Sequence, residues 1–192
     1  MTKQFLFLLG SARPDGNTEA LARRAASFLP SSAEQVWLRL MDHPLPIFED
    51  IRHHAARRYA IADDNEKKLL EATLAASDIV IASPLYWYSV SAGTKHYLDH
   101  WSAWMRLEGV DFKDRMAGKT MWAVSAFSDE DPKYAQPLID TLRLSAKYMH
   151  MRWGGVLLGY GNRHGDIFND NRSIERAVTF FNETASAADS AI

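Results

Sequence analysis

The chain alternates between two patterns of apolar residues: short unbroken apolar runs, and longer stretches in which apolar residues recur at helical spacing. Unbroken runs of this kind are typical of strands buried on both faces of a parallel sheet. They predict five strands, at residues 5–9, 35–40, 79–82, 120–125 and 156–158. The run Ile79-Val80-Ile81-Ala82 is the clearest central strand of the five.

A stretch with helical spacing follows each strand. We expect five helices, from after residue 17 to Pro30, from 63 to 76, from 91 to 105, from 137 to 149 and from 173 to 181. The strict alternation of strand and helix predicts a doubly wound α/β fold with parallel strands and helices on both faces of the sheet. The whole chain, residues 1–192, is interpreted as one domain whose alanine-rich tail frays after about residue 184.

Residues that favour helix starts support these limits. Asp63 or Asp64 can cap the second helix, and Glu66 is placed for a capping box with Asp63. Ser91 and Ser173 are candidate caps of the third and fifth helices. The fourth helix begins near Pro137, which is tolerated in a first turn.

The stretch 41–62 is the least regular part of the chain. Its sequence His43-Pro44-Leu45-Pro46 disfavours a helix, because each proline pushes the preceding residue out of the α region. We therefore expect a surface excursion between the second strand and the second helix.

Composition narrows the class of protein. The 192 residues include 22 basic and 24 acidic side chains, a formal net charge of -2, so charge does not favour nucleic acid or a membrane as a partner. There is no cysteine, which excludes disulfides, thiolate catalysis and cysteine-ligated metal centres. No apolar run approaches the ~18 residues of a membrane span. These features indicate a cytoplasmic protein.

The loop between the first strand and the first helix carries the most informative chemistry. It reads Gly10-Ser11-Ala12-Arg13-Pro14-Asp15-Gly16-Asn17-Thr18. A phosphate at this point meets free N–H groups and the positive end of a helix dipole, and Ser11, Arg13, Asn17 and Thr18 add donors. The loop matches neither the Walker motif nor the classical dinucleotide fingerprint. From these residues alone, a phosphate site and a simple capped turn remain equally open.

Two motifs together resemble a known family. The first loop is similar to the G-S-x-R-x-x-x-N-T pattern of NAD(P)H-dependent FMN reductases, in the flavodoxin-like superfamily. The segment from Ala76 to Ser91, ASDIVIASPLYWYSVS, resembles that family's second flavin loop, and Lys95 and Asp99 fall at its K-x-x-x-D spacing. The resemblance extends over about residues 3–160. It implies a flavodoxin-like, doubly wound, five-stranded parallel sheet of order 2-1-3-4-5.

The resemblance also implies a flavin site built from three loops. Ser11, Arg13, Asn17 and Thr18 would hold the 5′-phosphate of FMN. An alternative for Arg13 is the 2′-phosphate of NADPH. The second loop would lie along the isoalloxazine edge and the third would complete the pocket, although this chain lacks the glycines that relatives often carry after the fourth strand. The residues implied in these two loops are Pro84, Leu85, Tyr86, Trp87, Ser125, Ala126 and Phe127.

The function implied is an FMN-dependent oxidoreductase, with NADPH or NADH as co-substrate and ping-pong transfer to a small acceptor such as a quinone or azo compound. No catalytic side chain is assigned, because hydride transfer belongs to the cofactor. Family members commonly pair, so a homodimer or tetramer is expected. Two alternatives stay open: a flavodoxin-type electron carrier, which the near-neutral charge disfavours, and a cofactor-free interaction protein.

Two other signals are interpreted conservatively. His96 and His100 lie one helical turn apart, but no general-base Glu follows His96, so surface or interface histidines are favoured over a metal site. Trp101, Trp104 and Met105 form a stripe at helical spacing. Core packing and a dimer interface explain this stripe equally well.

Overall fold

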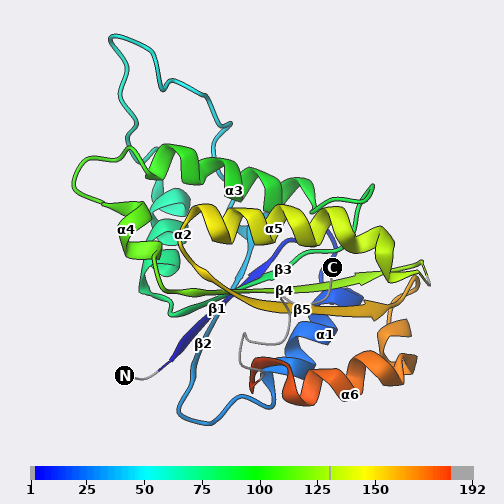
Figure 1. Cartoon of the computed structure of the whole chain (residues 1–192). Helices are drawn as coiled ribbons and strands as arrows, with labels where there is room; N and C mark the ends of the chain where they lie inside the picture. Colours follow the sequence, from blue (N-terminus) through cyan, green and yellow to red (C-terminus); the bar gives the residue numbers. More distant parts are fainter. Residues whose placement is uncertain (1–2, 130, 183–192) are drawn as a thin grey trace.

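Five parallel strands form a single sheet in the order β2-β1-β3-β4-β5, in a computed structural model that describes residues 3–129 and 131–182 (Figure 1). The strands are β1 Gln4–Leu9, β2 Glu34–Arg39, β3 Asp78–Ala82, β4 Thr120–Phe127 and β5 Arg152–Tyr160. Every neighbouring pair is parallel. The predicted fold class and strand order are therefore confirmed, and the strand order reverses between β1 and β3. The predicted fraying of the tail lies outside the described residues.

Helices cover both faces of the sheet. They are α1 Asn17–Ala26, α2 Asp64–Ala75, α3 Ala92–Trp104, α4 Phe112–Met116, α5 Gln136–Tyr148 and α6 Asn171–Thr179. Figure 1 shows α1 and α6 on one face and α3 and α5 on the other. The 3-10 turns are Leu40–Asp42, Pro132–Ala135, Asp166–Asn169 and Phe180–Asn182.

The period of two along each strand divides the core into two layers. In β1, Phe5, Phe7 and Leu9 face the layer under α1 and α6. Leu6 and Leu8 face the layer under α2 to α5. Both faces of β1 are buried, which explains why its sequence is an unbroken apolar run.

Several elements differ from the sequence prediction. The helix α1 ends at Ala26 rather than near Pro30, because Phe28 and Leu29 close the end in i to i-3 turns. The strand β5 is longer than predicted and pairs with β4 along its length. It runs through Gly154, where the Trp122 indole fills the space that a side chain would need. The short helix α4 was not predicted.

The capping predictions are confirmed at three of four places. The Asp63 carboxylate accepts from the Glu66 backbone N–H, Ser91 accepts from Thr94, and Pro137 lies in the first turn of α5. The return bond of the predicted capping box differs, because the Glu66 carboxylate accepts from the Ala62 N–H at 2.7 Å and not from Asp63. The prediction for α6 was wrong. Asp170 is its N-cap and accepts from the Ser173 N–H at 3.3 Å, because the chain turns into the helix three residues earlier.

The segment 43–63 contains no regular helix or strand and projects beyond the helical layer, as predicted (Figure 1). Its carbonyl at Pro46 lies 2.8 Å from Nε2 of His96 and 3.0 Å from Nε2 of His100. His100 is buried and also faces Glu66 at 3.3 Å, so the expectation of a surface or interface histidine was wrong for His100. The pair anchors the excursion to α3.

The aromatic stripe of α3 belongs to the core. Trp104 is fully buried and donates its indole N–H to Glu66 at 2.9 Å. Trp101 is buried against Phe112 of α4, so these two rings pack inside the chain, and Met105 packs partly buried against the same layer. Within residues 3–129 and 131–182, no helix has the length and apolar character to cross a membrane.

Candidate functional site

The first loop leaves β1 at the point where the strand order reverses. Gly10 donates its backbone N–H to the Ala82 carbonyl of β3 at 2.9 Å. A Cβ at Gly10 would collide with the Thr94 side chain, so only glycine lets the start of α3 approach the loop this closely. In a doubly wound sheet, ligands bind beside this switch point at the carboxyl ends of the strands.

The start of α1 carries backbone and side-chain donors of the kind that an anion requires. Its N-cap is Gly16, so no side chain satisfies the first helical N–H groups. Ser11 Oγ accepts from the Arg13 N–H at 3.1 Å, and Thr18 Oγ1 accepts from the Ala126 N–H at 3.1 Å. Because both hydroxyls act as acceptors in these bonds, each keeps its hydrogen for a ligand. With the exposed Arg13 guanidinium, this donor set fits a phosphate dianion.

A buried carboxylate beside the loop is neutralised by two arginines. Glu19 is only 2% exposed and lies 2.7 Å from both Arg23 and Arg39. Burial by itself would raise the pKa of Glu19, but the hydrogen bonds from the two guanidinium groups outweigh it and hold this pKa below its usual range. Arg39 also donates to the Arg13 carbonyl at 3.4 Å. Arg39 thus supports the loop and offsets a negative charge that would oppose an anion.

Asn17 has a role that the sequence did not suggest. Its side-chain amide donates to the Arg163 carbonyl at 2.8 Å and accepts from the Gly165 N–H at 3.0 Å. A Cβ on Gly161 would press against the same amide, so glycine is required there. Asn17 therefore fastens the loop after β5 to the start of α1.

The second loop is a strained hairpin held at both ends. Ser83 Oγ accepts from the Ser91 N–H at 2.9 Å and donates to the Pro84 carbonyl, which fixes the base of the loop. Tyr86 and Ser89 form a narrow antiparallel bridge. Trp87 and Tyr88 at its tip have φ of 50° and 65°, values usual for Asn-Gly turns. Strain of this kind is concentrated at functional sites.

The third segment departs from the predicted loop. The strand β4 continues through Phe127, so Ser125 and Ala126 belong to the strand and not to a loop. The longer strand follows from its pairing with β5, which reaches Tyr160. Ser125 is fully buried and its hydroxyl has no hydrogen-bond partner among the described residues. The loop proper begins at Ser128.

The three segments meet around a cavity of about 200 Å³. It brings together the predicted residues Ser11, Arg13, Asn17, Thr18, Pro84, Leu85, Tyr86, Ala126 and Phe127. Two predicted residues are not on its wall: Ser125 is sealed in β4, and Trp87 is 93% exposed at the hairpin tip. Gly161 and Asn162, which complete the wall after β5, were not predicted. The available signal was Gly161, a short distance beyond the apolar run 156–158.

Sheet order and pocket position together define a class. An open parallel sheet of order 2-1-3-4-5, with a phosphate-type cavity at the β1/β3 switch point, is the flavodoxin-like arrangement that holds FMN.

Comparison with known proteins narrows the class to a family. The family model for NADPH-dependent FMN reductases matches residues 4–162. YwqN of Bacillus subtilis (strain 168), described as an NAD(P)H-dependent FMN-containing oxidoreductase, is 31% identical over 169 residues, covering 88% of this chain and 91% of YwqN. The chain belongs to the NADPH-dependent FMN reductase family. Membership confirms the expected enzyme class, an NAD(P)H-dependent oxidoreductase that uses FMN.

Solved structures agree with this fold. The Trp repressor binding protein from Bacillus subtilis superposes with a TM-score of 0.73 at 25% identity, over 94% of this chain and 99% of that one. An azoreductase from Bacillus anthracis str. Sterne superposes with a TM-score of 0.64 at 16% identity, over 95% of this chain and 100% of that one. At the lower identity, the likeness concerns the fold alone.

Proposed function

We propose that the chain passes reducing equivalents from NAD(P)H, through FMN bound in the cavity at the β1/β3 switch point, to a small acceptor such as a quinone or an azo compound, by ping-pong turnover. The observation that carries the proposal is the uncapped start of α1, which faces the same cavity as the hydroxyls of Ser11 and Thr18. Bound FMN would supply the hydride chemistry.

The first-loop residues take the phosphate in this proposal. Ser11 and Thr18 donate hydroxyl hydrogens, Arg13 donates a charged fork, and Asn17 contributes its backbone N–H while its side chain holds the neighbouring loop. Charge-assisted contacts of this kind are the strongest hydrogen bonds available to a protein.

The other two segments orient the ring system. Pro84 and Leu85 present backbone and apolar surface from the hairpin, and Phe127 closes the cavity from β4. Tyr86 lines the mouth, and the exposed Trp87 beside it offers flat apolar surface to a ring or to a neighbouring subunit. One open face then serves NAD(P)H and the acceptor in turn, which is the geometry that ping-pong turnover requires. The azoreductase structure with the same fold is compatible with acceptors of this type.

We also propose a cytoplasmic homodimer or tetramer. The support is the group of exposed aromatic side chains Tyr86, Trp87 and Tyr88 on the second-loop hairpin, since aromatic residues are enriched at subunit interfaces. Light scattering after size exclusion, compared between wild type and Trp87→Ser, tests the assembly. A wild-type monomer would contradict it.

The visible spectrum tests the core of the proposal. Purified protein with added FMN is expected to show bound-flavin bands that bleach with NADPH or NADH under nitrogen. Parallel initial-rate lines with benzoquinone or an azo dye as acceptor would support ping-pong turnover, and intersecting lines would refute it. Bound flavin that does not bleach would indicate an electron carrier instead, and no uptake would indicate a cofactor-free protein.

A paired variant tests the phosphate contacts. Arg13→Ala with Thr18→Ala removes two contacts worth roughly 1.5–3 kcal/mol each, so the FMN dissociation constant should rise at least about 100-fold. The matched control is Arg115→Ala with Thr141→Ala, which removes the same side-chain types on α4 and α5, away from the cavity. Equal affinities for the two variants by fluorescence titration would refute the phosphate assignment.

A further inference from the structure

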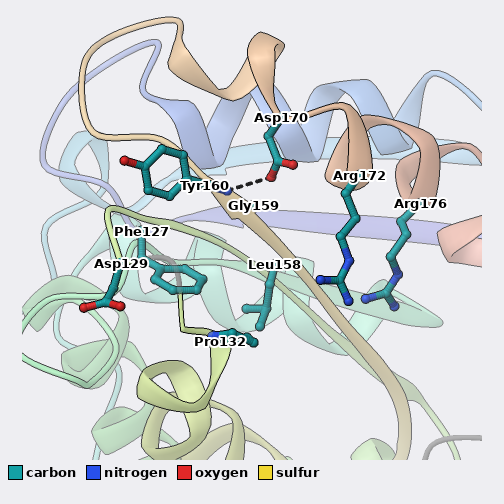
Figure 2. Close-up of a pocket in the computed structure, with 9 residues that line it drawn as sticks. All are labelled: Phe127, Asp129, Pro132, Leu158, Gly159, Tyr160, Asp170, Arg172 and Arg176. Atoms are coloured by element: carbon teal, nitrogen blue, oxygen red, sulfur yellow. Dashed lines mark hydrogen bonds between the residues drawn. The ribbon is translucent and has the colours of Figure 1, made fainter.

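A second cavity lies immediately beyond Phe127, at the outer edge of the sheet. It has a volume of about 270 Å³ and runs between β5, the start of α6 and Pro132 (Figure 2). Phe127 lines both this cavity and the candidate flavin pocket, so the two are neighbours. Phe127 is therefore a wall that the two cavities share.

Two arginines of α6 supply the charge of this cavity. Arg172 and Arg176 are one helical turn apart, and Figure 2 shows both side chains extending toward Leu158 and Pro132. Neither forms an ion pair or a side-chain hydrogen bond with any residue in 3–129 or 131–182, whereas Arg23 and Arg39 are paired. Like charges at this spacing weaken a helix. Two guanidinium groups without a partner among the described residues are suited to a phosphate group, whose oxygens can accept hydrogen bonds from both.

The two carboxylates of the cavity, Asp170 and Asp129, accept hydrogen bonds from backbone N–H groups. Asp170 accepts from the Tyr160 N–H at 2.8 Å through one oxygen and from the Ser173 N–H at 3.3 Å through the other. Asp129 accepts from the Asp131 N–H at 3.0 Å through Oδ1. Asp170 thus serves the backbone at the start of α6 and leaves the arginines to a ligand, while Asp129 keeps one oxygen for a hydroxyl or amino donor.

The rest of the wall is apolar and partly flat. Phe127, Pro132, Leu158 and Tyr160 line it opposite the arginines. A ring system that packs on this wall while a phosphate meets the arginines has the chemistry of an adenosine phosphate. A monoanion without a ring would leave this wall unused.

We propose that Arg172 and Arg176 bind the 2′-phosphate of NADPH, with the adenine on the apolar wall and the nicotinamide directed past Phe127 into the flavin pocket. The inference rests on the proposed flavin site. With this site NADPH is the preferred coenzyme, because NADH carries a neutral hydroxyl at the position where the 2′-phosphate dianion of NADPH would meet the two arginines.

The test is coenzyme selectivity in the FMN-loaded enzyme. Arg172→Ala with Arg176→Ala should raise the KM for NADPH about 100-fold, since each charged contact contributes roughly a factor of 10. The KM for NADH, and the FMN dissociation constant, should stay within about 2-fold of wild type. The control, Arg106→Ala with Arg115→Ala, removes two positive charges, one just after α3 and one in α4, and should leave the KM for both coenzymes unchanged.

A direct titration keeps the two proposals separable. The wild-type chain should bind 2′,5′-ADP at least about 10-fold more tightly than 5′-AMP by calorimetry, and the double variant should bind both equally. Equal binding of the two nucleotides to wild type, or equal changes in KM for NADPH and NADH, would overturn the inference. If the wild-type chain does not bind FMN, the proposed flavin site is refuted. The nucleotide titration would still show whether Arg172 and Arg176 bind a 2′-phosphate.

Discussion

The side chain of Asn17 has two possible roles, direct contact with the phosphate or support of a neighbouring loop. The sequence placed it among the phosphate donors, whereas its side-chain amide is bonded to the loop after β5 at Arg163 and Gly165. Asn17→Ala removes these two bonds, each worth about 1 kcal/mol net. It also leaves the buried Ile167 N–H, 3.5 Å from the Asn17 oxygen, without an acceptor, which adds about 1 kcal/mol.

The expected loss is therefore about 3 kcal/mol of the free energy of unfolding. For a chain of this size, that lowers the melting temperature of the flavin-free protein by roughly 6–12 °C. Asn17→Asp keeps the acceptor and loses only the donor, so its stability loss should be about 1 kcal/mol. Its new negative charge lies beside the anion site, so Asp should weaken FMN binding more than Ala does.

Two assays on the same samples decide the matter: thermal unfolding without flavin, and FMN titration by fluorescence. Asn169→Ala, an exposed asparagine near the same loop, is the control and should melt like wild type. If Asn17→Ala also melts like wild type but binds FMN weakly, the side chain is a direct phosphate donor and the reasoning from the loop is refuted.

Three further changes test other parts of the structure. Gly161→Ala should lower the melting temperature and FMN affinity together, because the added Cβ presses on the Asn17 amide; a loss of affinity alone would contradict this. Trp87→Asn should stabilise the chain by about 0.5–1 kcal/mol in urea unfolding, because Trp87 is 93% exposed and Asn tolerates a φ of 50° better. Hydrogen bonds from His100, the Ala62 backbone and Trp104 outweigh burial and hold the pKa of Glu66 below its usual value of 4.5. Its stabilising effect is therefore complete above about pH 4.5 and is lost as the pH falls through its lower folded pKa, so melting curves from pH 6 to 3 should fall more steeply for wild type than for Glu66→Gln.

Local sequence signals predicted most of the fold because they act over a few residues. The apolar runs at 5–9 and 79–82 require burial on both sides, and Asp63 and Ser91 cap helices through their own side chains. The sequence did not predict the length of β5. Its glycines argue against a strand until the Trp122 indole, from a strand distant in sequence, is seen to fill the space above Gly154.

In the candidate site, too, some residues could be predicted from the sequence and others could not. The residues Ser11, Arg13 and Thr18 could be chosen from the first loop, because a strand, a glycine-bounded turn and a helix start are adjacent in sequence. The roles of Asn17 and Arg39 could not, since their partners lie on the loop after β5 and on α1. Likewise, the sequence predicts a surface position for His100, but the 43–63 excursion packs against it and its Nε2 lies 3.0 Å from the Pro46 carbonyl.

The sequence by itself therefore determined the order of strands and helices along the chain, the layers of the core and the loop proposed to bind the phosphate. These properties follow from hydrophobic period and from donors close together in the chain. Only the tertiary structure decided which donors remain free, which carboxylates are neutralised and where Arg172 and Arg176 meet a cavity. These properties depend on hydrogen bonds and charge pairs between segments that are distant in sequence. A local sequence pattern does not show which distant segments will come into contact.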